Sequence, residues 1–420
     1  MGREYDDHHL FDTFILVLEM DKSESSGYKD LIWAIGLNRL NLEIVGLWPT
    51  TDGIIKRRFG SDILASFAFI MIALVTGIPM VHALMRVWGH MTLMIENLRL
   101  TLILITILFE LVIMRWKRTV LSSIINMIAE DWLTLKLSAE RDVMIKRAWT
   151  ARLIIIYSYV TTALAFIFYI IVPYFDAPLR QITNLTDRNK PLPMQTYYVY
   201  DTDKSLQFEL TFLAQAITVL VALLIYVGVN ALLGLVILHM CGQLENFKHN
   251  IVNLTSGKDF NKALSSCVVT HLRLIRYANN VENTFTFILF VLVLKFGMVF
   301  CLCGFIFLTV ITDENINNAN FSQISYTVVV LICLLTQTFF YCFGGELITE
   351  HCDAVYYTIC NLDWYTWKSR EAKNLIPLML LTKEPFRITA GKVLPLTMTT
   401  FCSLLKTSAG YVSILLAMRN

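Results

Sequence analysis

Two lysines lie inside long apolar segments of the chain, Lys295 within residues 285–311 and Lys406 within residues 393–418. A charged side chain is costly to place in a membrane, and such residues usually contact water or a carboxylate and serve a function. Lys406 can extend to a water-filled path or pair with a carboxylate, and Lys295 can extend to water in the same way. The sequence identifies no partner for either lysine.

The segment around Lys406 is the most polar of the apolar segments and is rich in serine and threonine. A polar stripe on a membrane-spanning helix should face the interior of a bundle or water. One further face of this helix is small or apolar and consists of Gly410, Ile414, Ala417 and Met418. As a pore lining, this face would close the pore by an apolar constriction. It can equally pack against lipid or another helix, and the residues alone leave both interpretations open.

Residue types that perform catalysis or bind metals are scattered along the chain. There are nine cysteines and eight histidines, with no CxxC pair and no HExxH sequence. Walker loops, nucleophile elbows, GxGxxG sequences and paired carboxylates inside apolar segments are also absent from the sequence. The cysteines are interpreted as reduced, small apolar residues. We therefore expect no enzymatic activity, no cofactor and no bound metal.

The composition is that of a membrane protein. Of 420 residues, 56% are hydrophobic and only 16% are charged, and the mean hydropathy is +0.58. Soluble domains carry about 25% charged residues, so a soluble enzyme, a disordered chain and a coiled coil are all disfavoured. The net charge of +2 gives no indication of a nucleic-acid partner.

Seven segments are long and apolar enough to span a bilayer, which takes about 20 residues as a helix. They are residues 63–85, 98–114, 153–173, 212–238, 285–311, 324–343 and 393–418. The expected fold is an all-α polytopic membrane protein with seven transmembrane helices.

Basic residues indicate the orientation of these helices. With a cytoplasmic N-terminus, the inside segments carry 26 lysines and arginines and the outside segments carry 6, which favours this orientation by the positive-inside rule. The acidic N-terminus lacks the apolar core of a signal peptide. Glycosylation sequons at Asn184 and Asn320 fall outside, whereas that at Asn253 falls inside. The C-terminus is therefore expected to be extracellular, which is opposite to a G-protein-coupled receptor.

This topology divides the chain into successive regions. They are a cytoplasmic N-terminal region (1–62), helices one to four (63–238) with an extracellular loop (174–211), a cytoplasmic helical extension (239–284), helices five and six (285–343), cytoplasmic anchor helices (344–392) and the last spanning helix (393–420).

The predicted cytoplasmic segments have helical periodicity. One apolar stripe comprises Leu264, Val268, Leu272 and Ile275, and another comprises Val355, Ile359 and Leu362. An apolar face in water must be covered. Spans four, five and six are therefore expected to continue as helices into the cytoplasm and to pack on one another or on a partner subunit. Independent amphipathic surface helices are the alternative.

The C-terminal third closely resembles insect odorant receptors. The residues that carry the resemblance are Asp363-Trp364-Tyr365, Glu371-Ala372-Lys373, Thr389-Ala390-Gly391-Lys392, Thr400-Phe401, and Leu405-Lys406-Thr407-Ser408 with Tyr411, together with Gly46-Leu47-Trp48-Pro49 before the first span. In this combination and order the motifs are specific, although each alone is weak. The other two thirds of the chain match the family in hydropathy and topology.

The resemblance implies an odorant-binding subunit of a ligand-gated cation channel in the plasma membrane of olfactory neuron dendrites. Members of the family form heterotetramers with a shared coreceptor, with four last spans around the pore and cytoplasmic helices at the main interface. By position, Ile414 matches the apolar gate of the family. Ala417 and Lys406 replace a glutamine and a glycine of the coreceptor, which implies a tuning subunit.

The resemblance also places an odorant pocket in the outer half of the bundle, among spans two, three, four and six. Volatile ligands need an apolar, largely closed pocket with few polar groups. Residues that share faces there, or match a family pocket position, are Thr162, Ala165, Tyr169, Gln215, Val219 and Tyr326. Each of them can instead be an ordinary packing residue.

Two other functions fit the same hydropathy. A transporter or lipid-handling protein with an apolar cavity would show saturable flux without channel conductance. A gustatory-type receptor channel shares the fold, but the Thr-Tyr…Gln-Phe ending of that group is absent.

Overall fold

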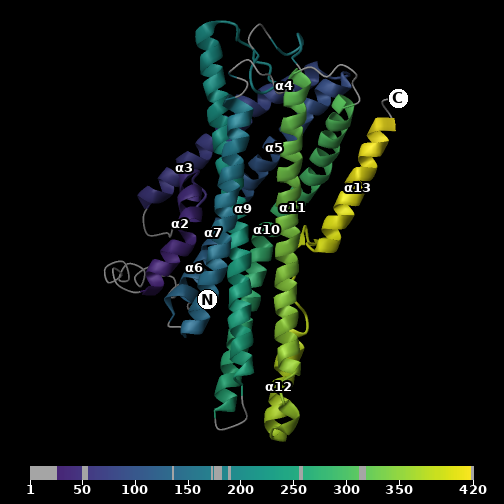
Figure 1. Ribbon diagram of the computed structural model, residues 1–420. Coiled ribbons are helices and arrows are strands. Elements are labelled where there is room, and N and C mark those ends of the chain that lie inside the picture. The colour runs from purple at the N-terminus through teal and green to yellow at the C-terminus, as the bar shows by residue number, and fades with distance from the viewer. Residues whose placement is uncertain are drawn as a thin grey trace.

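The structure is a computed structural model, and it describes residues 26–49, 55–134, 137–171, 174, 182–187, 191–254, 259–311 and 318–417. Within these ranges the chain is mostly helical, so the all-α prediction is confirmed. The long helices run side by side, and three of them extend well below the others (Figure 1).

The first helices are α2 (Ser26–Ile44), α3 (Ile55–Ile70), the π-helical segment η1 (Met71–Gly77), α4 (Ile78–Arg86), α5 (Met91–Trp116) and α6 (Arg118–Leu133). They are followed by α7 (Ser138–Phe166), the π-helical segment η2 (Ile167–Ile171), α9 (Ser205–Val252), α10 (Phe260–Ile311) and α11 (Asn318–Cys360). The chain ends with η3 (Trp364–Thr366), α12 (Ser369–Thr382), the short strands β1 (Thr389–Ala390) and β2 (Leu394–Pro395), and α13 (Met398–Ala417).

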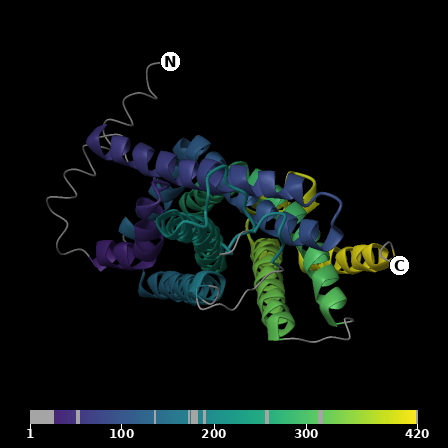
Figure 2. The ribbon, with the colours of Figure 1, turned by 90° about the horizontal axis from the view of Figure 1, so that it is seen from above.

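Six helices of the described ranges are long and apolar enough to cross a membrane. They are Phe59–Arg86, Met91–Trp116, Ser138–Ile171, Ser205–Val252, Phe260–Ile311 and Ile324–Thr366. They contain the first six predicted spans, except for residues 172–173 of the third, which lie outside the described residues, and the chain is a multi-pass membrane protein. Helix α13 covers most of the seventh predicted span, whose first residues instead form β2 and its flanks. It lies at one edge of the bundle, beside α10 and α11 (Figure 2). This arrangement agrees with seven transmembrane helices.

The three longest helices are longer than a helix needs to be to cross a bilayer. Helices α9, α10 and α11 have 48, 52 and 43 residues, which corresponds to about 65–80 Å at 1.5 Å per residue. The hydrocarbon core of a bilayer is about 30 Å thick. The three helices also pack on one another, so spans four, five and six continue as packed helices beyond the predicted apolar segments. That these extensions are cytoplasmic stays a prediction.

The buried face of the extension of α10 differs from the predicted stripe. Leu272 is 51% exposed, although the prediction placed it on the covered face. The face that is buried consists of Leu264, Cys267, His271 and Leu274. His271 belongs to it because its ring stacks between Phe247 and Phe386, with centroids 5.5 and 5.7 Å away. A histidine in the extension of a spanning helix does not by itself indicate a buried position between two aromatic rings.

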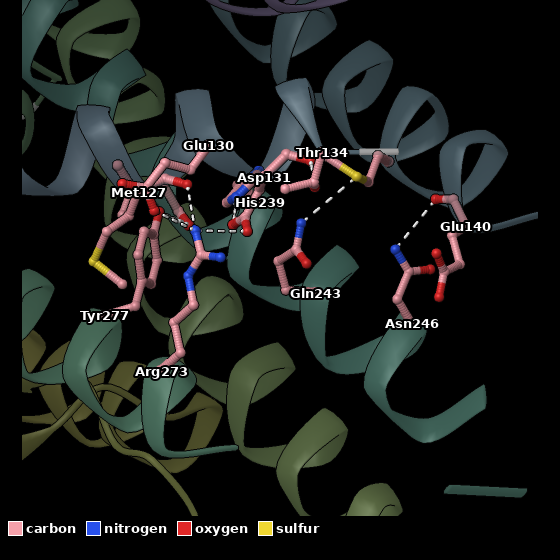
Figure 3. A network of polar contacts seen from close by, with 12 residues as sticks. Met127, Glu130, Asp131, Thr134, Glu140, His239, Gln243, Asn246, Arg273 and Tyr277 are labelled. Atoms are coloured by element: carbon pink, nitrogen blue, oxygen red, sulfur yellow. Dashed lines mark hydrogen bonds and ion pairs between the residues drawn. The ribbon is translucent and has the colours of Figure 1, made fainter. Parts of the chain in front are cut away.

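A polar network joins the extensions to α6 (Figure 3). One guanidinium nitrogen of Arg273 on α10 lies 3.0 Å from a Glu130 oxygen and 2.9 Å from an Asp131 oxygen. The second oxygen of Asp131 lies 2.9 Å from Nε2 of His239 on α9. These contacts connect three helices at one level and fix the position of α6 against the long pair.

The Thr389-Ala390-Gly391-Lys392 motif forms the turn of the β1–β2 hairpin. Gly391 and Lys392 have positive φ angles of 66° and 60°, a conformation that glycine adopts without strain. The Gly391 amide donates to the Thr286 carbonyl at 2.9 Å, and the Thr389 amide donates to the Glu282 carboxylate at 3.1 Å. The motif therefore docks the start of the last helix on α10.

Candidate ligand-binding cavity

A cavity of about 460 Å³ lies among α5, α7, α9, α10 and α11. Its lining is mostly aliphatic and aromatic, with residues such as Leu104, Ile107, Leu223 and Phe340. These aliphatic and aromatic side chains are about as apolar as lipid tails, so they need no hydrogen bonds from water. A volume of this size suits a small apolar molecule.

Five of the six predicted pocket residues line this cavity. They are Thr162 and Ala165 on α7, Tyr169 on η2, Val219 on α9 and Tyr326 on α11. Sequence reasoning selected them from three separate spans, and the fold brings them around one space. Their role in binding a ligand stays a prediction.

Gln215 does not line the cavity. Its buried side chain accepts a hydrogen bond from the Met194 amide at 3.2 Å and donates to the Thr196 hydroxyl at 2.9 Å. It also donates to the Tyr198 hydroxyl at 3.3 Å, and that hydroxyl donates to the Val75 carbonyl. Burial raises the pKa of Tyr198, which keeps the phenol protonated. Gln215 thus holds residues of the loop before α9, and among them Met194 lines the cavity.

Two tyrosines line one end of the cavity, and an arginine lies against one of them. The rings of Tyr169 and Tyr326 lie 5.6 Å apart, and the Arg99 guanidinium lies 5.1 Å from the Tyr326 ring. Arg99 also donates to the Thr327 hydroxyl at 3.3 Å. The Tyr326 ring is therefore held between a cation and a second ring, in a defined orientation.

The middle of the cavity is polar, which sequence reasoning did not detect. Five lining residues bring polar groups together there, and we call them the polar cluster: Tyr226, Asn230, Lys295, Gln337 and Tyr341. The Lys295 ammonium donates to the Gln337 amide oxygen at 3.3 Å. Lys295 was noticed in the sequence, but its partners come from α9 and α11 and no sequence spacing relates them.

The charge partner of Lys295 is Glu110. Their side chains interact electrostatically inside the bundle, and only 5% of Lys295 and 1% of Glu110 is exposed. Lys295 therefore does not extend to water. The expectation that a membrane lysine finds either water or a carboxylate is met by the carboxylate.

A model of the odorant receptor family, described as 7tm odorant receptor, matches residues 90–409 of this chain. The chain belongs to this family. The resemblance inferred from the C-terminal motifs is thereby confirmed, and the family is one of non-enzymatic receptors.

Individual relatives are distant. Odorant receptor 13a of Drosophila melanogaster is 22% identical over 262 residues, 58% of this chain and 59% of that receptor. Odorant receptor 10 of Aedes albopictus is 26% identical over 227 residues, 52% of this chain and 58% of that receptor. The chain thus matches less than two thirds of the length of either relative.

The fold is also shared with a solved structure. The insect olfactory receptor OR5 from Machilis hrabei, in complex with eugenol, matches with a TM-score of 0.78 and 12% identity, over 94% of this chain and 100% of that chain. At this identity the likeness shows the fold, and eugenol is a ligand of that receptor.

In this odorant receptor, the last helix packs with one side only. Ser408 and Val412 of α13 are buried, with the Ser408 carbonyl 3.4 Å from the Cys301 sulfur on α10. The other side leaves Gly410, Ile414 and Ala417 exposed. Lys406 lies on the same exposed side. Met418, the fourth residue of the predicted pore face, lies outside the described residues.

Proposed function

We propose that this odorant receptor chain is a tuning subunit of a ligand-gated, non-selective cation channel that it forms with the coreceptor. The observation that carries the proposal is the apolar cavity, which is suited to a small volatile or apolar ligand. In this proposal the N-terminus and the extensions of α9, α10 and α11 are cytoplasmic, the C-terminus is extracellular, and the protein resides in the plasma membrane of sensory dendrites.

The path from cavity to pore runs through two helices. Both α10 and α11 line the cavity and also contact α13. On α11, Phe339 places its ring 5.9 Å from Phe401 of α13. A ligand that fits the cavity better in one arrangement of these helices shifts the population toward it, and α13 moves with them. The exposed face of α13 would line the shared pore, with Ile414 as the apolar gate.

The direct test is coexpression with the coreceptor, followed by recording of currents during application of an odorant panel. We expect inward cation current to at least one small apolar odorant. Surface-expressed receptor that gives no current to any ligand, or saturable substrate flux without conductance, would contradict the proposal.

Tyr326→Ala should weaken the response to the ligand. Removing a buried ring from the centre of a binding site typically costs about 2 kcal/mol, which is roughly a 30-fold rise in half-effective concentration. Tyr326→Phe keeps the ring between Arg99 and Tyr169 and should respond like the parent. An unchanged concentration dependence in Tyr326→Ala would remove this residue from the site.

Ile414→Ala should raise the current that flows without ligand. A smaller side chain widens an apolar constriction and lets water and ions pass, so basal leak should increase several-fold in recordings of the coexpressed channel. Tyr326→Ala serves as the control because it alters the cavity and not the pore face. Identical leak and identical ion permeability in Ile414→Ala and the parent would exclude the gate assignment.

A further inference from the structure

The polar cluster restricts which molecules can occupy the cavity. Gln337 lies eleven residues after Tyr326 on α11, which is about three helical turns, and the lining continues past it to Gly344 and Leu347. A ligand that extends from the tyrosine pair along the cavity therefore reaches the polar cluster. An odorant site made only to hold hydrocarbon would not need a buried lysine there.

The hydroxyl donors of the polar cluster are all used within the protein. The Tyr226 hydroxyl donates to the Gln337 amide oxygen, and the Gln337 amide nitrogen donates to the Tyr341 hydroxyl. The Tyr341 hydroxyl donates in turn to the side-chain oxygen of Asn230, whose nitrogen donates to the Tyr226 carbonyl at 2.7 Å. This chain of bonds fixes the side chains and leaves none of their hydroxyl protons for a ligand.

Asn230 and Gln337 each use one of their two amide N–H donors within the described residues, and Lys295 leaves more donors unused. An ammonium group has three N–H donors, and within the described residues one hydrogen bond from it is found, to Gln337. Neither oxygen of Glu110 accepts a hydrogen bond from the described residues. Lys295 lines the cavity and Glu110 does not. A group in the cavity that accepts a hydrogen bond from Lys295 is thus the contact that the site lacks.

An uncharged ligand group fits this position best. A carboxylate ligand would bring a charge into a region of low dielectric constant that already holds the buried Glu110 carboxyl group. An ammonium ligand would face the like charge of Lys295. The polar cluster is therefore suited to an uncharged group.

We propose that this cavity binds an uncharged apolar molecule that carries a ketone or ester carbonyl, whose oxygen accepts a hydrogen bond from Nζ of Lys295 while the hydrocarbon part extends toward Tyr326. The inference depends on the proposed function only in taking the cavity as the odorant site.

Binding can be measured on the purified receptor without recording current, from the shift of its thermal unfolding with ligand concentration. The probes are methyl hexyl ketone, octane, octanoic acid and octylamine, which have the same number of carbon atoms. We expect the ketone to bind at least about tenfold more tightly than each of the other three, because only the ketone accepts a hydrogen bond from the Lys295 ammonium group without bringing an ionisable group into the cavity.

The decisive variant is the pair Lys295→Met and Glu110→Gln in one chain. It removes the donor and its counter-charge together, so no unpaired charge is left in the bundle. We expect it to bind octane as the parent does and to lose the tenfold preference for the ketone. Lys262→Met removes an exposed lysine from the same helix and should keep the preference.

Equal binding of ketone and octane by the parent, tighter binding of octanoic acid, or a ketone preference that survives in the double variant would each overturn the inference. Ketone-selective binding without any current from the coexpressed receptor would support the inference and contradict the channel proposal instead. The two proposals can therefore fail separately.

Discussion

Lys295→Met as a single substitution is expected to remove most of the folded receptor from the cell surface. The change leaves the Glu110 carboxylate buried, with 1% exposure and no hydrogen-bond partner among the described residues. Breaking a buried ion pair on one side costs about 3–5 kcal/mol, which is a large part of the stability of a typical domain. Surface labelling and the thermal unfolding of the purified receptor measure the effect.

The matched comparison is the double variant in which Glu110→Gln accompanies Lys295→Met. Because both charges leave together, most of the lost stability should return. Lys262→Met controls for removal of a lysine from α10 at an exposed position. If the single variant unfolds at the same temperature as the double variant, Glu110 and Lys295 are not an energetic pair.

Gly345→Ala is expected to displace the last helix. A β-carbon on Gly345 of α11 would lie 2.2 Å from the Leu396 carbonyl oxygen, which belongs to the backbone just before α13 and cannot rotate away. The next residue, Glu346, accepts a hydrogen bond from the Met398 amide at 3.2 Å and places a negative charge at the helix N-terminus. Overpacking against backbone costs about 3 kcal/mol, so both thermal stability and ligand-gated current should fall.

Gly297→Ala on α10 provides the control for this substitution. A β-carbon there would meet nothing within 4 Å, and alanine favours the helix by about 1 kcal/mol over glycine. Its stability should equal or exceed that of the parent. Unchanged unfolding and normal current in Gly345→Ala would show that the hairpin and α13 do not need this close approach.

Apolar length and local motifs were readable from the sequence. The spans were predicted because the hydropathy of 20 consecutive residues is a local property. The motif from Thr389 to Lys392 was recognised because its turn needs particular residues in order, including Gly391 with φ of 66°. The chemistry of the cavity was partly readable, since Thr162, Ala165 and Tyr169 recur at the spacing of one helix face.

The sequence did not predict correctly which side of a helix contacts another helix. A spanning helix is apolar on the side that faces lipid and also on the side that faces protein, so periodicity does not reveal which side is which. Gln215 was therefore assigned to the pocket, whereas its amide bonds Met194 and Thr196 of the outer loop. On α10, Leu272 was assigned to the covered face and is exposed.

The sequence by itself thus determined that this protein is a polytopic helical receptor of the odorant receptor family. It also determined which helix carries the small or apolar face that includes Ile414. Only the tertiary structure decided that Lys295 donates a hydrogen bond to Gln337 and interacts electrostatically with Glu110, and that Lys295 and Gln337 line the same cavity as Tyr326. The reason is that a buried charge is stabilised by groups on other helices, and the relative rotation and depth of packed helices are set by side-chain packing across the whole bundle.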